Sequence, residues 1–264
     1  MSRSQVEALG RLRDQFEEGR YEEAEAGAIA LAAAARRGRR RRSRAVVWSA
    51  RVVATTAAVA HGRGSGVPAE LDALIEELEQ TEGSDRALLL LARVIRAAVL
   101  VRRERYTEAE AEAQDVLRAT TRIAHLTKVW RIELAALGTM AEALCGQRRY
   151  KEAEAIAQGN LYRTEGPMAA ALHCLLVRSL NGQERYEEAL SEARRLPPHS
   201  ARAGSGSAGI VTAMALDGLG RRAEAEVTAR QAVADCEQFL HPEHPRIQEA
   251  RTLLARITGE APRS

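Results

Sequence analysis

The chain has 264 residues, 45% of them hydrophobic and only 3% aromatic, and carries a formal net charge of +3 at pH 7. This hydrophobic content excludes a wholly disordered chain. The abundance of Ala and Leu, which are strong helix formers, favours a helical protein over a strand-rich one. Three widely spaced cysteines without a CxxC pair argue against a disulfide framework or a zinc site, and fit a reducing compartment such as the cytoplasm.

Apolar residues at helical spacing, interrupted at glycine- and proline-containing stretches, predict a chain of consecutive helices. The predicted helices span residues 4–18, 21–36, 40–60, 68–81, 84–103, 107–122, 126–146, 151–163, 168–182, 186–196, 203–219, 222–240 and 246–257. The breaks at 61–66, 164–167 and 197–207 are too short to separate independent domains. We therefore expect one domain over 1–264.

Between the second and third predicted helices, residues 36–44 read RRGRRRRSR. This candidate basic patch consists of Arg36, Arg37, Arg39, Arg40, Arg41, Arg42 and Arg44. Such a patch can bind nucleic acid or an anionic surface. No aromatic residue is interleaved with the arginines, which disfavours single-stranded nucleic acid. The alternative is a solvated loop in a chain whose preference for Arg reflects a GC-rich coding sequence, and we favour this alternative over nucleic-acid binding.

The apolar stretch 45–61 follows this patch and resembles a membrane anchor only superficially. It is short for a membrane span and contains Arg51. The N-terminus MSRSQVEALG has no apolar signal region. We expect a buried helix here and no membrane span.

One short phrase recurs along the chain. Its copies are GRYEEAEA at 19–26, ERYTEAEA at 104–111, RRYKEAEA at 148–155, ERYEEALS at 184–191 and a degenerate RRAEAEVT at 221–228. Four of the five tyrosines occupy the same slot, and GVPAELDAL at 66–74 falls where a missing copy is expected. The phrase suits a helix–turn–helix junction. A polar or glycine residue makes the turn, the tyrosine packs between the helices, and acidic residues open the second helix, where its dipole favours negative charge.

These hairpins resemble tetratricopeptide repeats (TPR) over about residues 4–258. The resemblance implies an all-α fold, a right-handed α-solenoid of about six hairpins plus a C-terminal capping helix. Most copies are spaced by more than 34 residues, so we expect an irregular superhelix. The segment FLHPEHPRIQEARTLLARI at 239–257 is similar to the junction of kinesin-light-chain-type repeats. Pro245 suits the first turn of a closing helix that covers the open end.

In TPR proteins the ligand usually lies on the concave face that the first helices of the hairpins line. The resemblance therefore implies a partner-binding set of Arg13, Glu17, Arg102, Glu142, Arg178, Asn181, Met214 and Asp217. The Lys/Asn set with which some relatives bind a C-terminal carboxylate is not evident at these positions.

No residue pattern indicates catalysis, a cofactor or a metal. His241, Glu243 and His244 of the HPEHP stretch are possible metal ligands, but two prolines make this an extended turn without a third strong ligand nearby. A structural junction is the favoured interpretation. Cys145 and Cys174 lack a recognisable base, so core packing is expected for them.

The sequence thus predicts a non-enzymatic scaffold or adaptor that binds a protein or peptide in the groove of a TPR solenoid. One alternative is a regulatory protein that senses a small molecule or a peptide. A second alternative is binding of nucleic acid or an anionic surface through 36–44. Self-association is left open.

Overall fold

The computed structural model describes residues 3–37, 41–63, 66–80, 86–123, 129–196 and 206–259, and the side chains of 41–43 lie outside this description. Within these ranges the chain forms thirteen α-helices and one 3-10 turn, and no strand occurs among them. The helices are α1 (Arg3–Glu17), α2 (Tyr21–Arg36), α3 (Arg41–His61), α4 (Val67–Glu79), α5 (Arg86–Arg102), α6 (Tyr106–Ile123), α7 (Trp130–Gly146), α8 (Tyr150–Asn160), α9 (Gly166–Gly182), α10 (Tyr186–Ala193), α12 (Ser207–Gly218), α13 (Arg222–Phe239) and α14 (Pro245–Thr258). The predicted all-α fold is confirmed.

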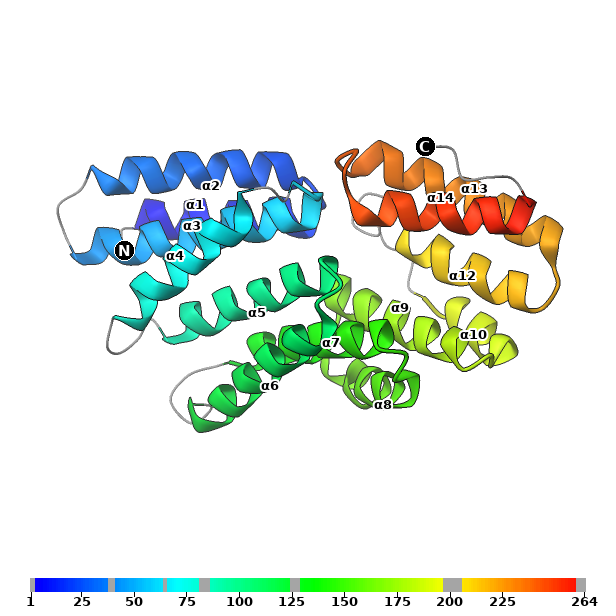
Figure 1. Cartoon of the computed structure of the whole chain (residues 1–264). Coiled ribbons are helices and arrows are strands. Elements are labelled where there is room, and N and C mark those ends of the chain that lie inside the picture. The colour runs from blue at the N-terminus through cyan, green and yellow to red at the C-terminus, as the bar shows by residue number, and fades with distance from the viewer. Residues whose placement is uncertain are drawn as a thin grey trace.

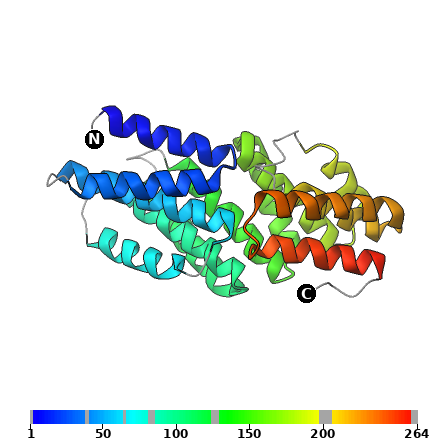
Figure 2. The same cartoon turned by 90° about the horizontal axis from the view of Figure 1, so that it is seen from above.

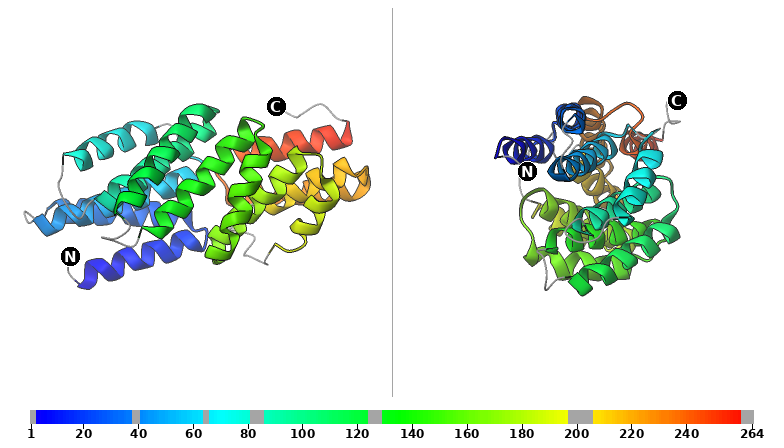
Figure 3. Two further views of the ribbon diagram at one scale, coloured as in Figure 1. Left: turned by 90° about the horizontal axis from the view of Figure 1, so that it is seen from below. Right: turned by 90° about the vertical axis from the view of Figure 1, so that its left-hand side faces the viewer.

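The helices pack as a row of hairpins in two layers (Figure 1). Each helix contacts its neighbour in sequence, and the first helices of successive hairpins also contact one another, α3 with α5, α5 with α7, α7 with α9, and α9 with α12. The view from below in Figure 3 shows these hairpins following one another along the molecule. This arrangement is the α-solenoid that the repeat predicts. The prediction of a single domain over 1–264 stays a prediction.

Alanines and leucines between the layers form the core. They allow close approach because Ala is small, and Ala24, Ala109, Ala153, Ala189 and Ala225, three residues after the tyrosine slot, are fully buried. The largest fully buried side chains include Leu71, Leu74, Leu134, Leu144, Leu172 and Ile210.

The repeated phrase forms the turn inside each hairpin. The residue two positions before the tyrosine slot has a left-handed backbone, with φ 76° at Gly19, 58° at Glu104, 61° at Arg148, 62° at Glu184 and 72° at Gly220. The next amide then bonds back to the preceding helix, as Arg185 N does to the Leu180 carbonyl at 3.0 Å. This is the Schellman arrangement that ends a helix.

Three of the recurring tyrosines pack against a glycine of the following unit. A Cβ on Gly182 would lie 2.4 Å from Cε1 of Tyr150, and a Cβ on Gly146 would lie 2.3 Å from Cε1 of Tyr106. Gly218 receives Tyr186 in the same way. Only glycine leaves room for the ring at these positions, so each tyrosine fixes the distance to the next hairpin.

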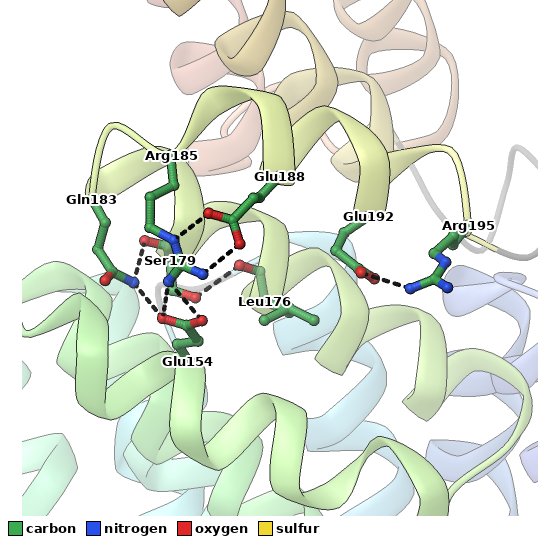
Figure 4. A network of polar contacts seen from close by, with 8 residues as sticks. All are labelled: Glu154, Leu176, Ser179, Gln183, Arg185, Glu188, Glu192 and Arg195. Carbon is green, nitrogen blue, oxygen red and sulfur yellow. Dashed lines mark hydrogen bonds and ion pairs between the residues drawn. The ribbon is translucent and has the colours of Figure 1, made fainter.

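Arginines that precede the tyrosine slot connect adjacent units by ion pairs. Figure 4 shows Arg185, whose guanidinium bonds to Glu188 of its own hairpin at 2.6 Å and to Glu154 of the preceding hairpin at 2.8 Å. Gln183 donates to Glu154 at 2.6 Å. Arg149 repeats this pattern with Glu110 of the unit before it at 2.7 Å.

Helix α3 is a core helix that is held to α4 by a buried arginine. Arg51 is 7% exposed and bonds to Glu70 at 2.6 Å and to Glu77 at 2.7 Å, while the Trp48 indole donates to Glu77 at 3.0 Å. No helix in the described ranges is long and apolar enough to cross a membrane. Arg51, which argued against a membrane span, thus serves as an interhelical contact.

Several helix ends differ from the predicted ones. Helix α8 ends at Asn160, whose side-chain amide donates to the Ile156 carbonyl at 2.8 Å, and residues Leu161–Arg163 form a 3-10 turn. Helix α10 ends at Ala193 instead of 196, and Leu196 at the predicted end precedes Pro197, a position that disfavours helical backbone. Helix α12 begins after Gly206, whose φ is 76°. The predicted helix starts at 40, 84, 126 and 203 fall on residues outside the described ranges.

The two ends of the solenoid meet at a seam, where the turn between α13 and α14 contacts the end of the α2–α3 hairpin. The His241 amide donates to the His61 carbonyl at 3.0 Å, and the two imidazole rings meet edge-on at 5.6 Å. Figures 1 and 2 both show the blue and the orange helices approaching each other there. Pro245 opens α14 as predicted, and the His244 side chain caps this helix by accepting from Arg246 N at 3.0 Å.

Candidate binding site on the inner face

Charged side chains from four helices gather on the inner face. They are Arg102 at the end of α5, Glu142 on α7, Arg178 on α9, and Arg246 and Glu249 on α14. We call these five residues the inner charged cluster. The structure therefore brings together three of the predicted partner-binding residues, Arg102, Glu142 and Arg178, and adds two that the repeat pattern did not indicate.

Arg178 and Glu249 form a close ion pair within the cluster, with Nη1 and Oε1 2.5 Å apart. Their side chains are 31% and 37% exposed, so they are accessible from the inner face. Although burial alone opposes the charge, the attraction and hydrogen bond of Glu249 raise the pKa of Arg178. The pKa of Glu249 is lowered because Arg178 and Arg246 outweigh its burial. Both groups are ionised at neutral pH.

Arg102 lies at the point where the inner face meets the seam. Its Nη1 lies 3.2 Å from Nε2 of His244, and its side chain is half-buried. Burial and repulsion from Arg246 lower the pKa of Arg102 to about 10, against the attraction of Glu142. Burial, together with the charges of Arg102 and Arg246, lowers the pKa of His244 to about 2, so this imidazole is neutral.

The cysteines near the cluster are unreactive thiols. Burial raises the pKa of Cys145 to about 11 and also raises the pKa of Cys174, although Arg178 lies close enough to both to oppose this. Burial likewise raises the pKa of Cys236 to about 11. No group of three or more metal-ligating side chains occurs in the described part of the chain. His241, Glu243 and His244 lie in the turn between α13 and α14, where His241 bonds to His61 and His244 caps α14, and the absence of a metal site stays a prediction.

The remaining predicted partner-binding residues lie elsewhere. Arg13 and Glu17 are exposed on α1, where Glu17 lies 3.9 Å from Arg131. Asn181 is 5% exposed and donates to the Val211 carbonyl at 2.8 Å, so it joins α9 to α12 inside the core.

Met214 and Asp217 lie on α12. Met214 is partly buried and packs against the C-terminal core, and Asp217 pairs with Arg256 of α14 at 3.2 Å. The closing helix therefore contacts Asp217, one of the residues that the repeat pattern placed on the binding face.

The basic patch is described only in part. Arg36, Arg37 and Arg44 are exposed, and the Arg44 guanidinium lies 5.7 Å from the centre of the Trp48 ring. Arg39 and Arg40, and the side chains of Arg41 and Arg42, lie outside the described residues. Binding of nucleic acid or an anionic surface through this patch stays a prediction.

The sequence analysis did not place any residue of α14 in the candidate site. Arg246 and Glu249 follow HPEHP, and the repeat pattern assigned this helix only a capping role. Their charge is the signal that could have indicated these two residues. A helix that only covers the end of a core needs no charged side chains at these positions of its first turns.

No known protein family and no curated protein matches the sequence. Among solved structures, a Rap protein complexed with competence and sporulation factor superposes with a TM-score of 0.70 at 13% identity, over 97% of this chain and 71% of that one. The apo form of RapI superposes with a TM-score of 0.60 at 10% identity over the same shares. Both neighbours are TPR-type helical repeat proteins. This chain has a TPR-like repeat fold. The comparisons give no support to the kinesin-light-chain likeness of the last TPR-like unit, which stays a prediction.

Proposed function

We propose that this TPR-like protein is a peptide-sensing adaptor that binds a peptide, or an extended segment of a partner protein, on its inner face. The observation that carries the proposal is the inner charged cluster, in which both signs of charge converge from α5, α7, α9 and α14. A peptide offers charged and polar groups spaced along a backbone, and such a cluster can pair with several of them at once. The Rap structure complexed with competence and sporulation factor supports a binding role for this fold.

A binding role is favoured over catalysis by the chemistry of the inner face. The thiols there are held protonated, and a protonated thiol is a poor nucleophile. Arg102, whose pKa is about 10, Arg178, whose pKa is raised by Glu249, and Glu249, whose pKa is lowered by Arg178 and Arg246, all keep their charge at neutral pH. We therefore propose that the protein is not an enzyme.

A sensing role is favoured by the position of Arg102 beside the seam. A ligand held by the cluster would contact α5 and α14, which lie on opposite sides of the His61–His241 contact. Such a ligand would have different affinities for the form in which His61 and His241 are in contact and for a form in which they are apart. It would therefore shift the balance between the two forms. The outer surface of the solenoid would then present a different curvature to a partner.

The proposal is tested by site-specific photocrosslinking. The photoreactive amino acid p-benzoylphenylalanine replaces Glu142 on the inner face or, as a control, Lys151, which is exposed at the start of α8. Each variant is irradiated with a biotinylated random hexapeptide pool, and captured peptides are quantified. We expect crosslinks from position 142 and not from 151, and excess unlabelled peptide should remove them. Equal crosslinking from both positions would contradict binding on the inner face.

A further inference from the structure

Both histidines of the HPEHP turn use the same ring nitrogen to hold the backbone of the turn. Nδ1 of His241 accepts the backbone N–H of Glu243 at 3.3 Å, and Nδ1 of His244 accepts the backbone N–H of Arg246 at 3.0 Å. Each histidine is followed by a proline, which has no N–H, so the amide after the proline is the first donor that the following chain offers to the ring. The turn therefore depends on two imidazole acceptors, and the second of them also caps α14.

A protonated imidazole makes neither of these bonds. The neutral ring has one acceptor nitrogen, whereas the imidazolium carries a hydrogen on both nitrogens and only donates. At His244 the ring also joins two elements, because the Ala60 carbonyl of α3 hydrogen-bonds to it while its Nδ1 caps α14. An imidazolium at this position would direct a donor at the Arg246 amide, and would place positive charge at the start of a helix, where the helix dipole disfavours it.

The charged groups around His244 also oppose a proton on its ring. Arg102 of α5 places Nη1 3.2 Å from its Nε2, Arg246 follows it on α14, and His61 of α3 repels it when both rings are protonated. Burial and, after it, these three groups lower the pKa of His244 to about 2. The closed seam therefore holds this ring in its neutral form, whereas a ring released into water protonates with the ordinary pKa of about 6.5.

The other side of the seam contains charges of both signs. Glu22 of α2 lies 4.0 Å from Nδ1 of His61, Glu25 of α2 pairs with Arg63 at 2.5 Å, and the His61 and His241 rings meet edge-on at 5.6 Å. The titratable and charged residues that line the cavity of about 300 Å³ between the two turns are Arg20, Tyr21, Glu22, Glu23, His61 and His241. Because Glu22 partly offsets a proton on His61, His244 is the imidazole whose charge the closed seam accommodates least.

The closed seam leaves little room for the turn to rearrange. Gly62, directly after α3, has φ 99°, and a Cβ there would lie 2.7 Å from Cβ of His244. The His241 amide is bonded at the same time to the His61 carbonyl at 3.0 Å. A turn that loses its two acceptors must therefore move away from α3 before it can adopt another shape.

We propose that the HPEHP turn is a pH-sensitive switch, in which protonation of His241 and His244 removes the two acceptors of the turn and opens the seam while the hairpins stay folded. The proposal goes beyond peptide binding, because the switch responds to protons in the absence of any ligand. Opening would move α14 away from the ends of α3 and α5. The closed form is fully favoured above about pH 6.5, and its ratio to the open form falls about tenfold per pH unit below that value for the proton on His244.

The test measures the distance across the seam by double electron–electron resonance. The amino acid p-acetylphenylalanine replaces Ala26 on α2 and Gln248 on α14, which are both exposed, and each copy carries a nitroxide label. We expect one short distance at pH 7, a second and longer distance at pH 5, and a return to the short distance when the pH is raised again. The ratio of the long to the short distance should rise about ten- to twentyfold between pH 6.5 and pH 5. The far-ultraviolet circular dichroism should stay constant over this range.

Two variants decide whether the histidines of the turn are responsible. The double variant His241→Asn with His244→Asn keeps a side-chain oxygen that accepts the N–H two residues on but does not titrate, so it should show the short distance at both pH values. His244→Asn alone gives the same comparison if the double variant does not fold. His173→Asn removes an imidazole that bonds to Glu192 at 3.1 Å outside the seam, and should open in acid as the wild-type protein does.

Nitrogen-15 spectra of the imidazole rings test the starting state of the switch. At pH 7 the ring of His244 should be neutral, with its proton on Nε2 and none on Nδ1. A proton on Nδ1 at pH 7 would overturn the proposal, because the turn would then lack this acceptor already. It is also overturned if the distances are the same at pH 7 and pH 5, if the asparagine variants open in acid like the wild-type protein, or if the helix content falls together with the short distance.

Discussion

At the scale of single residues, the distance between successive hairpins depends on a tyrosine ring that packs against a glycine. Tyr150 lies against Gly182 so closely that a methyl group there would overlap the ring. The scarcity of aromatic residues makes this contact conspicuous, since four of the five tyrosines of the chain serve in the repeated slot. The tyrosines were predictable from the phrase. The glycines were not, because each lies four residues before the next slot and meets a ring from another unit.

The glycine at this contact should not tolerate a side chain. We expect Gly182→Ala to destabilise the protein by about 1–3 kcal/mol, because the ring of Tyr150 must move. Gly159→Ala is the control, since Gly159 is also helical but has no atom within 4 Å of an added Cβ. It should be neutral or stabilising by up to about 1 kcal/mol. Urea unfolding of both variants distinguishes the two effects, and equal changes would contradict the packing role.

The left-handed turn residues give a second prediction. Glu184 has φ 62°, a conformation that costs a residue with a side chain about 1–2 kcal/mol. Glu184→Gly should therefore stabilise the protein by about 0.5–1 kcal/mol, net of the entropy that glycine loses on folding. Gly220→Ala is the reverse change at an equivalent turn with open space around it, and should destabilise by a similar amount. Thermal unfolding measures both, and a destabilised Glu184→Gly protein would refute the argument.

At the scale of helices, local sequence predicted most of the fold because each helix carries its own periodicity and each hairpin its own turn. The ends that differed were set by local competition, as at Asn160, whose side chain bonds back to the helix that it ends. The inner charged cluster was less predictable. Arg102 and Arg246 are 144 positions apart in the numbering, and their approach depends on the accumulated rotation of every hairpin between them. No pattern within one repeat contains that information.

The clamp between α3 and α4 gives a prediction at this scale. Arg51 is 7% exposed, whereas Glu70 and Glu77 are about half exposed. Arg51→Met should cost little, about 0–1.5 kcal/mol, because the carboxylates can regain water and the thioether keeps the volume. The double variant Glu70→Gln with Glu77→Gln leaves a buried cation without counter-charge and should cost about 3–5 kcal/mol. Chemical denaturation compares them, and the opposite order would contradict this assignment.

At the scale of the whole molecule, the turn that precedes α14 makes contacts on two sides. On one side of this turn, His244 contacts Arg102 and caps α14, and on the other side His241 bonds to the backbone of His61. The seam and the part of the inner charged cluster that lies on α14 therefore depend on the same five-residue segment, HPEHP, and the helix that follows it.

The folded protein, in which this turn is packed against α3 and α5, should lose stability in acid. The pKa of His244 is about 2 in the folded protein, where Arg102, Arg246 and His61 face it, and about 6.5 when unfolded. The folded pKa is depressed, so the stabilisation is complete above about pH 6.5 and is lost as pH falls below it, by about 1.4 kcal/mol per pH unit. Burial also lowers the pKa of His61, which acts in the same direction.

The variant His244→Asn tests this dependence. Asparagine caps helices well and cannot titrate, so it should keep the cap of α14 and lose part of the acid sensitivity. We expect the wild-type protein to lose about 2 kcal/mol more than this variant between pH 6.5 and pH 5, measured by urea unfolding at each pH. If the free energies of unfolding of the two proteins change equally with pH, His244 does not cause the acid sensitivity.

A row of repeats that touch only their neighbours frays from its two ends. Here the end of α3 also contacts the turn before α14, so the C-terminal hairpin is not free to fray until the contact between His61 and His241 has opened. Forming that contact closes a loop from residue 61 to residue 241, whose entropy must be overcome after the intervening hairpins are in place. The seam should therefore form last during folding. In the native protein, the His241 amide should exchange its hydrogen before those of the hairpin cores, reporting the first step of unfolding.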